Sequence, residues 1–159
     1  MTVLSDKSIT KSIEVKEITI EPFREINLTP NGYDLTISEV EIPDKKKILE
    51  GNLIIAPGER FAISTEEIIC CGKNHCAQLW LRTSWARKGI ICSFGKVDSG
   101  FKGNLTMLGI NSSKKEISIE IGNTFAQIVF EKLSTPAGES YSDRSGNYQD
   151  QKGITWSKE

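Results

Sequence analysis

Arginine and hydroxyl side chains gather in the segment 81–90, which has the sequence LRTSWARKGI. The guanidinium group of Arg82 offers paired, planar donors to a phosphate, and the hydroxyl groups of Thr83 and Ser84 can add single hydrogen bonds. A helix that starts here would also present free backbone N–H groups. These three residues form a candidate anion-binding cradle. The alternative is an ordinary helix start with solvated charges, and no GxxxxGKS or GxxxxGKT phosphate loop occurs in the chain.

A second candidate is the carboxylate of Asp98, which ends an apolar run and precedes Ser99 and Gly100. A carboxylate in such a place can orient or deprotonate a water molecule. The alternative is a turn aspartate whose side chain caps its own backbone. The local sequence leaves both interpretations open.

Two further polar side chains interrupt apolar stretches. Asp34 lies within NGYDLTI, and Gln127 lies within GNTFAQIVF. A buried carboxylate must be hydrogen-bonded or paired, so Asp34 could hold a metal-bound water, make a subunit contact or only satisfy backbone donors. The amide of Gln127 can donate and accept hydrogen bonds at a phosphate or at the backbone.

Three of the four cysteines, Cys70, Cys71 and Cys76, lie beside the only histidine, His75. Zinc is a weak hypothesis because the Cys-Cys-x4-Cys spacing is not that of a Cys-x2-Cys knuckle. Buried or half-buried thiols are favoured for all four, including Cys92, and no disulfide is expected in a reducing cytosol. A single histidine also weakens any scheme in which a base activates a serine or cysteine nucleophile.

The scaffold that positions these side chains is predicted to be all-β. Short segments rich in Ile, Val, Thr and Phe alternate with turn signals. Ile117, Ile119 and Ile121 alternate with polar residues, as in a half-buried strand. A barrel, sandwich or jelly roll is therefore expected. We expect strands over 18–20, 33–42, 52–54, 60–64, 76–82, 90–92, 95–97, 102–111, 116–121 and 124–133, and short helices over 5–12 and 83–88.

The composition fits one domain followed by a polar tail. The chain has 159 residues and a mass of 17.7 kDa, which is long enough to bury a core. From Ser134 onwards it is polar and poor in aliphatic residues, as disordered tails are. Yet this tail holds Tyr141, Tyr148 and Trp156, and an arm that becomes ordered over a ligand has the same composition.

The charge balance and the apolar runs limit the classes of partner that we expect for this protein. There are 20 Lys and Arg residues against 21 Asp and Glu residues, a net charge of −1, which argues against a surface that grips nucleic acid through its phosphates. No apolar run is long enough to span a bilayer, and the N-terminus lacks the pattern of a secretory signal. We therefore expect a cytoplasmic protein that binds neither nucleic acid nor membrane.

Taken in order, the segments resemble the motifs of the dUTPase and dCTP deaminase superfamily. LSDKSI at 4–9 resembles the deaminase opening, and GNYQDQKGIT at 146–155 resembles the deaminase-type C-terminal arm. Between them, NGYDL, LRTSWARKG, GKVDSGFKG and GNTFAQIVF resemble the four shared motifs. No single segment is specific, but their order and spacing cover nearly the whole chain.

The resemblance implies a distorted jelly-roll, a β-clip-like barrel with one or two short helices, formed by residues 1–133. Residues 134–159 would be a flexible C-terminal arm that closes over the active site. The resemblance also implies a homotrimer with active sites at the subunit interfaces, a deoxynucleoside triphosphate substrate and Mg²⁺ as cofactor. A trimer would bury sheet edges and apolar faces that one small β domain exposes.

One position separates the two activities of this superfamily. The resemblance implies that deaminases of this superfamily share a glutamate, which moves protons while water attacks the cytosine ring. It lies five residues after the glycine of the third motif and three before its asparagine. Here Gly103 and Asn111 set that register, and the position holds Leu108. Leucine cannot transfer a proton, and dUTPases have an apolar residue at this position.

The remaining roles are carried over by resemblance. Asp98 corresponds to the dUTPase aspartate that orients the attacking water. Arg87 corresponds to a second arginine found in deaminases and bifunctional relatives, and the resemblance implies a catalytic role for it. Asp34 would at most contact a metal-bound water, and no direct metal ligand is assigned. Phosphate contacts are implied for Arg82, Thr83, Ser84, Gln127, Tyr141, Tyr148 and Gln151. Base and sugar contacts are implied for Phe101, Gly103, Leu105, Leu108 and Ile110, with Phe101 packing on deoxyribose.

Some features depart from typical dUTPases. The Gly-rich final motif is absent, Gly100-Phe101 replaces Asp-Tyr, and Thr83 replaces a serine. The sequence therefore predicts a deaminase-type scaffold that acts as a dUTP diphosphatase, forming dUMP and pyrophosphate by water attack at the α-phosphate. The alternatives are a dCTP deaminase, including a bifunctional one with a substitute proton carrier, and a deoxynucleotide-binding regulatory protein without turnover.

Overall fold

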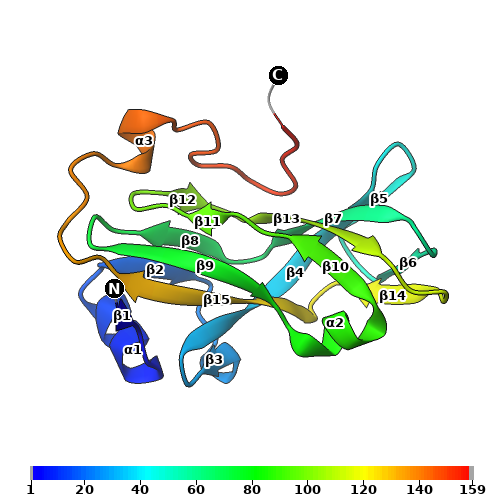
Figure 1. Ribbon diagram of the computed structural model, residues 1–159, viewed down its shortest axis with the longest axis horizontal. Coiled ribbons are helices and arrows are strands. Elements are labelled where there is room, and N and C mark those ends of the chain that lie inside the picture. The colour runs from blue at the N-terminus through cyan, green and yellow to red at the C-terminus, as the bar shows by residue number, and fades with distance from the viewer. Residues whose placement is uncertain (1, 158–159) are drawn as a thin grey trace.

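The computed structural model describes residues 2–157, and strands are its main regular elements (Figure 1). Most of them belong to one curled sheet that forms a half-barrel, so the all-β expectation is confirmed. The strands are β1 (Thr2–Val3), β2 (Ile18–Glu21), β3 (Leu28–Thr29), β4 (Gly32–Ile42), β5 (Lys46–Ile48), β6 (Asn52–Ile55), β7 (Arg60–Thr65), β8 (Ile68–Cys71), β9 (His75–Leu81), β10 (Ile90–Ser93), β11 (Lys96–Val97), β12 (Lys102–Gly103), β13 (Thr106–Asn111), β14 (Ile117–Glu120) and β15 (Thr124–Lys132).

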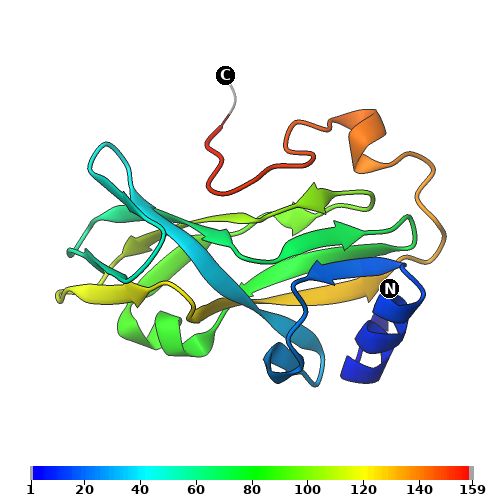
Figure 2. The ribbon, with the colours of Figure 1, turned by 180° about the vertical axis from the view of Figure 1, so that it is seen from behind.

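The main sheet has the strand order β10-β13-β7-β4-β15-β9-β11, with β1 paired to β15 and both β3 and β5 paired to β4. Strand β4 is long and crosses the middle of the sheet obliquely (Figure 2). Its burial pattern is almost continuous, which explains why alternation is weak in this segment. Two smaller sheets, β12-β8-β2 and β14-β6, flank the main one.

Three short helices and one 3₁₀ turn complete the described residues: α1 (Asp6–Glu14), α2 (Thr83–Lys88), α3 (Tyr141–Arg144) and η1 (Glu25–Asn27). The side chain of Ser5 accepts a hydrogen bond from the Ser8 N–H at 3.3 Å and caps α1. Gly89 ends α2 in a left-handed conformation, with φ at +98°. Helices α1 and α2 were expected from the sequence, whereas α3 was not. Ser140 and Asp143 form a capping box at the start of α3, and their spacing in the sequence could have indicated it.

The strand expected over 102–111 is interrupted. It divides into β12 and β13 because the side chain of Asn104, between the two strands, hydrogen-bonds to the backbone of another part of the chain. Its side-chain amide donates to the carbonyl oxygens of Thr65, Glu66 and Glu67 at 3.0–3.3 Å. The break allows β12 to pair with β8 while β13 pairs with β7, so this segment joins two sheets.

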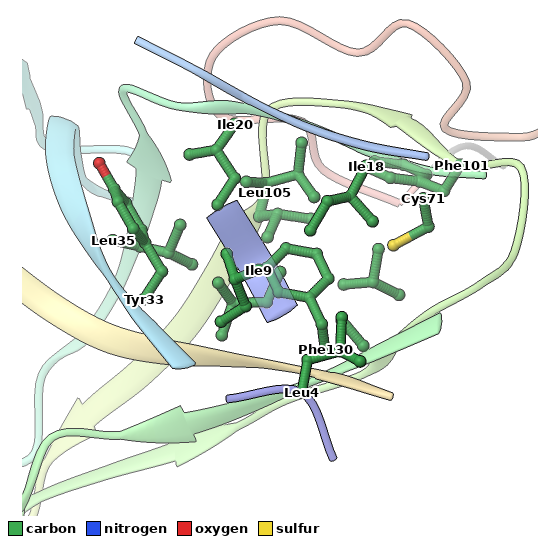
Figure 3. Packing of buried hydrophobic residues seen from close by; sticks show 14 residues of the cluster. Leu4, Ile9, Ile18, Ile20, Tyr33, Leu35, Cys71, Phe101, Leu105 and Phe130 are labelled. Carbon is green, nitrogen blue, oxygen red and sulfur yellow. The ribbon is translucent and has the colours of Figure 1, made fainter. Parts of the chain in front are cut away.

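The interior contains two apolar clusters, one at each end of the main sheet. The first includes Ile9 from α1, Phe130 from β15 and the residues Phe101 and Leu105 (Figure 3). Partly buried Tyr141 and Tyr148 pack against this cluster and belong to the C-terminal segment, residues 134–157. The core is therefore continuous with the surface that the C-terminal segment covers. The second cluster is built around Phe61, Phe125 and Trp85.

Candidate active site

An apolar pocket of about 360 Å³ opens between β11, β13 and the C-terminal segment. Small-molecule sites are usually concave and mainly apolar, with a few polar groups that orient the ligand. Seven of the residues that were expected at the active site lie in its wall: Asp98, Phe101, Leu105, Leu108, Tyr141, Tyr148 and Gln151.

The pocket lies where two strands separate. The ladder between β10 and β13 runs from Ile90 opposite Asn111 to Ser93 opposite Leu108. Beyond that point the chain leaves β13, and β11 pairs with β9 instead. Among residues 2–157, no strand takes the place of β10 beside the start of β13. A flat ligand with donors and acceptors on one edge could occupy this gap and bond to the strand backbone.

Asp98 lies at the rim of the pocket, in the turn that follows β11. The backbone N–H of Phe101 donates to the Asp98 carbonyl oxygen at 3.1 Å and closes the turn, and Gly100 adopts a φ of +85° within it. The Asp98 side chain is exposed and makes no hydrogen bond or ion pair with any described residue. Its carboxylate is therefore free to accept a hydrogen bond from water.

Two aromatic rings form one wall. Phe101 is 6% exposed, and its ring meets that of Tyr141 edge to face with centroids 5.6 Å apart. The Tyr148 N–H donates to the Tyr141 hydroxyl oxygen at 3.1 Å, which links two turns of the C-terminal segment. Such rigid aromatic surfaces suit contact with a sugar or base.

The C-terminal segment follows β12 like an added strand. The Asn104 N–H donates to the Gln151 carbonyl oxygen at 3.0 Å, and the Asp150 N–H donates to the Lys102 carbonyl oxygen at 2.8 Å. Gly103 forms a parallel bridge with Gln151, and a Cβ at Gly103 would lie 3.0 Å from the Gln151 backbone. Gly103 therefore allows the C-terminal segment to lie close to β12, and it does not line the pocket. Ile110, on β13, also lies outside the pocket wall.

The other predicted phosphate contacts form a separate cluster. The Arg82 Nε lies 3.1 Å from Asp34 Oδ2, and its Nη1 also hydrogen-bonds to Thr124 Oγ1. The Gln127 amide donates to Thr29 Oγ1 at 3.1 Å and lies 3.5 Å from Asp34 Oδ1. Asp34 therefore pairs with protein groups. This partly buried carboxylate pairs with the Arg82 side chain, a partner that none of the three outcomes expected from the sequence had named.

Arg82 and Asp98 are far apart within one chain. Val97 pairs with Ala77, so Asp98 lies beside the Cys76 end of β9, whereas Arg82 follows the opposite end of that strand. Six residues of strand separate these ends, a distance of about 20 Å. Thr83, Ser84 and Arg87 are exposed on α2, beyond Arg82. A single chain does not bring this second group of predicted residues to the pocket.

The cysteines and the histidine are buried or half-buried. Within residues 2–157, no group of three or more His, Cys, Asp or Glu side chains could hold an ion. All four thiols are free, and burial raises the pKa of Cys92 to about 12. Burial also lowers the pKa of His75, which favours its neutral form. These residues behave as core groups, in line with the interpretation favoured from their spacing.

Several residues near the pocket were missed from the sequence. Thr106 lines it, and Lys96 lies at the same rim as Asp98. Trp156, which the sequence had marked only as an aromatic residue of the tail, also lines it. Glu39 and Glu41 of β4 hold the end of the C-terminal segment. The two glutamates alternate with apolar residues, a pattern that indicates only an outward face of a strand. Their partners lie more than a hundred positions away, and the sequence holds no signal for that contact.

Fold and site together define a curled β-sheet protein with an apolar, partly covered pocket and a free carboxylate at its rim. Residues 3–133 match the family profile described as dCTP deaminase-like, and this chain belongs to that family. The resemblance seen in the motifs is thereby confirmed.

None of the helices in residues 2–157 has the length and apolar character needed to cross a membrane.

Individual relatives carry two different names. The dCTP deaminase of Pyrococcus horikoshii is 39% identical over 146 residues, which are 90% of this chain and 92% of that protein. The probable deoxyuridine 5′-triphosphate nucleotidohydrolase of Sulfolobus islandicus rod-shaped virus 1 is 34% identical over 160 residues, 99% of either chain. The crystal structure of the dCTP deaminase from Agrobacterium tumefaciens has a TM-score of 0.70 at 16% identity. The match covers 83% of this chain and 49% of that one and shows a shared fold.

Proposed function

We propose that this protein is a dUTP diphosphatase that forms dUMP and pyrophosphate. The observation that carries the proposal is Leu108, an apolar side chain in the wall of the pocket. By resemblance, deaminases of the family have a proton-transferring glutamate at this position. Leu108 is 37% exposed and faces a pocket that also holds the unpaired Asp98. The pocket therefore has a group that can activate water at its rim and none at the leucine position that could protonate a cytosine ring.

In the proposed reaction, Asp98 accepts a hydrogen bond from a water molecule and aims it at the α-phosphorus. A bond forms between the water oxygen and phosphorus, and the bond to the oxygen bridging the α- and β-phosphates breaks. Pyrophosphate leaves with that electron pair, and the proton of the water passes to the Asp98 carboxylate and then to solvent. General-base catalysis of this kind contributes about 10²- to 10⁴-fold to the rate.

The base and sugar would lie deeper in the same pocket. The gap between β11 and β13 suits the edge of a uracil ring, which carries both donors and acceptors. Phe101 would pack on the deoxyribose, supported from behind by Tyr141. Tyr148 and Gln151 of the C-terminal segment would close over the nucleotide.

A homotrimer would bring the second cluster to the pocket. Arg82 lies about 20 Å from Asp98 within one chain, so we propose that Arg82, Thr83, Ser84, Arg87 and Gln127 serve the pocket of a neighbouring subunit. The Arg82 side chain is 40% exposed and could turn a free edge of its guanidinium group to a phosphate.

Mg²⁺ is the expected cofactor, and the residues fit it only in part. Within residues 2–157, no cluster of three carboxylates or imidazoles could cage an ion, and Asp34 is paired with Arg82. Mg²⁺ commonly binds with several waters and substrate phosphate oxygens, which needs no such cage. The ion would then help neutralise the triphosphate. We expect chelation by EDTA to abolish pyrophosphate release and added Mg²⁺ to restore it.

The site of attack is tested by running the reaction in H₂¹⁸O. Attack at the α-phosphorus places the label in dUMP, as mass spectrometry would show, and leaves the released pyrophosphate unlabelled. Label in the pyrophosphate would refute this mechanism.

Sharing of the site between subunits is tested by mixing variants. Assayed at dUTP concentrations well below KM, Arg82→Ala and Asp98→Asn homo-oligomers should each be at least about tenfold less active than the unaltered protein. After co-refolding, mixed oligomers should regain activity, because some pockets combine an intact Asp98 with an intact neighbouring Arg82. Mixtures that stay inactive, or a monomer by light scattering, would contradict the shared site.

A dCTP deaminase is the second candidate, because relatives such as that of Pyrococcus horikoshii carry this name. It would need another proton carrier near Leu108. By strand register, Glu41 pairs with Ala62 and Ala62 with Leu108, so this carboxylate shares a row with Leu108 two strands away. That spacing is about 10 Å, and Glu41 already accepts a hydrogen bond from Trp156. These contacts favour the diphosphatase.

A further inference from the structure

The end of the C-terminal segment crosses the main sheet on the face that carries the pocket. The Thr155 N–H donates to Thr106 Oγ1 at 3.0 Å, which fixes the crossing above β13. In the sheet, Thr106 pairs with Ser64 and Ser64 with Glu39. The segment thus lies above the sheet on the side of β4 (Figure 2).

Glu39 holds the first part of this crossing. Its Oε2 accepts a hydrogen bond from the Ile154 N–H at 2.9 Å and lies 2.7 Å from the Lys47 ammonium group. Gly153 makes the approach possible, because a Cβ there would lie 2.6 Å from Glu39 Oε1 and the residue has a φ of +62°. The glutamate is only 18% exposed, so its contact with the backbone is shielded from solvent.

Glu41 holds the second part. Its Oε1 accepts a hydrogen bond from the Trp156 indole N–H at 3.0 Å. The ring of Trp156 lines the pocket together with Leu108. A single carboxylate therefore fixes an aromatic side chain in the wall of the pocket.

We propose that Glu39 and Glu41 are positioning residues that hold the C-terminal segment closed over the pocket of its own chain. Both glutamates come from the rigid central strand, and both accept from donors in residues 154–156. Hydrogen bonds to a charged acceptor are stronger than neutral ones, so two of them can set the closed population of a short segment. The kinetic consequence rests on the proposed function, whereas the contact itself does not.

The contact is tested in the free protein by hydrogen exchange measured with mass spectrometry. In Glu39→Ala or Glu41→Ala, amide exchange in the peptide covering residues 146–157 should accelerate about tenfold, while exchange in β4 and β15 stays unchanged. Glu39→Gln keeps an acceptor and should restore part of the protection. Glu50→Ala, an exposed glutamate outside the contact, is the matched control. Unchanged exchange in both alanine variants would overturn the proposal.

Pairing between Glu41 and Trp156 is tested by a double-mutant cycle. Trp156→Phe keeps a ring in the pocket and removes the indole N–H. If the two groups act through one hydrogen bond, the exchange rate of the double variant equals that of the faster single variant. Effects that multiply would show that they act independently and would overturn this pairing.

The effect on substrate is measured with dUTP. Glu39→Ala and Glu41→Ala should raise KM about tenfold and leave kcat within about twofold, because the segment must close before it contacts the nucleotide. Faster exchange with an unchanged KM would overturn the positioning role. If the protein does not hydrolyse dUTP at all, the exchange measurements still decide whether the two glutamates hold the segment.

Discussion

Replacement of Asp98 by asparagine separates the proposed chemistry from the fold. Asparagine has almost the same shape, and the turn that holds position 98 is closed by its backbone carbonyl rather than by its side chain. Because the exposed carboxylate has no partner among the described residues, the free energy of unfolding should change by less than about 0.5 kcal/mol. The loss of a general base should lower kcat by about 10²- to 10⁴-fold, a rise of about 2.7 to 5.4 kcal/mol in the barrier.

The assay combines turnover with binding. Pyrophosphate release gives kcat and KM for dUTP, and calorimetric titration with a non-hydrolysable imido analogue gives affinity without chemistry. Asp44→Asn serves as a matched control, because Asp44 is exposed in the turn after β4 and away from the pocket. The variant at position 98 should bind the analogue within about threefold of the unaltered protein.

Two results would refute this reasoning. A kcat within about threefold of the unaltered protein would show that Asp98 does not activate the water. A large loss of stability would show that the carboxylate supports the fold through contacts other than those seen here.

Three further predictions concern phosphate binding, the core and pH. Arg82→Ala should raise KM for dUTP at least tenfold in steady-state assays, and an unchanged KM would contradict its role at a phosphate. Phe125→Ala, at a fully buried ring, should lower the free energy of unfolding by about 3 to 5 kcal/mol in urea titrations, and a loss under about 1 kcal/mol would contradict the packing. Burial raises the pKa of Glu67 above its ordinary 4.5, so its charged form is disfavoured in the fold. The protein should lose stability, relative to Glu67→Gln, as the pH rises from about 4.5 through that raised pKa, and parallel stability curves would contradict this.

Strand positions could be predicted from the sequence because their signals are local. Ile117, Ile119 and Ile121 alternate with polar residues, and β14 lies in that segment. Strand β8 was missed because Ile68–Cys71 has no polar alternation and is only four residues long, between Glu67 and Gly72. The division between β12 and β13 depends on Asn104, whose partners come from residues 65–67 and 151, and no local pattern records those contacts.

The residues of the candidate site also differ in whether the sequence alone could indicate them. Asp98, Phe101 and Leu108 follow one another closely along the chain, so a motif could indicate them together. The pairing joins Arg82, at the start of α2, to Asp34 of β4, and no local pattern in the sequence links these two residues. The hold of Glu39 and Glu41 on the C-terminal segment depends on how the chain returns across the sheet. Such contacts arise from topology rather than from local periodicity.

The choice between diphosphatase and deaminase is decided most directly by product analysis. The purified protein is incubated with Mg²⁺ and either dUTP or dCTP, and the nucleotides are separated by anion exchange. With Leu108 in place of a proton carrier, dUTP should be converted to dUMP while dCTP stays unchanged. Formation of any uracil nucleotide from dCTP would contradict the central claim.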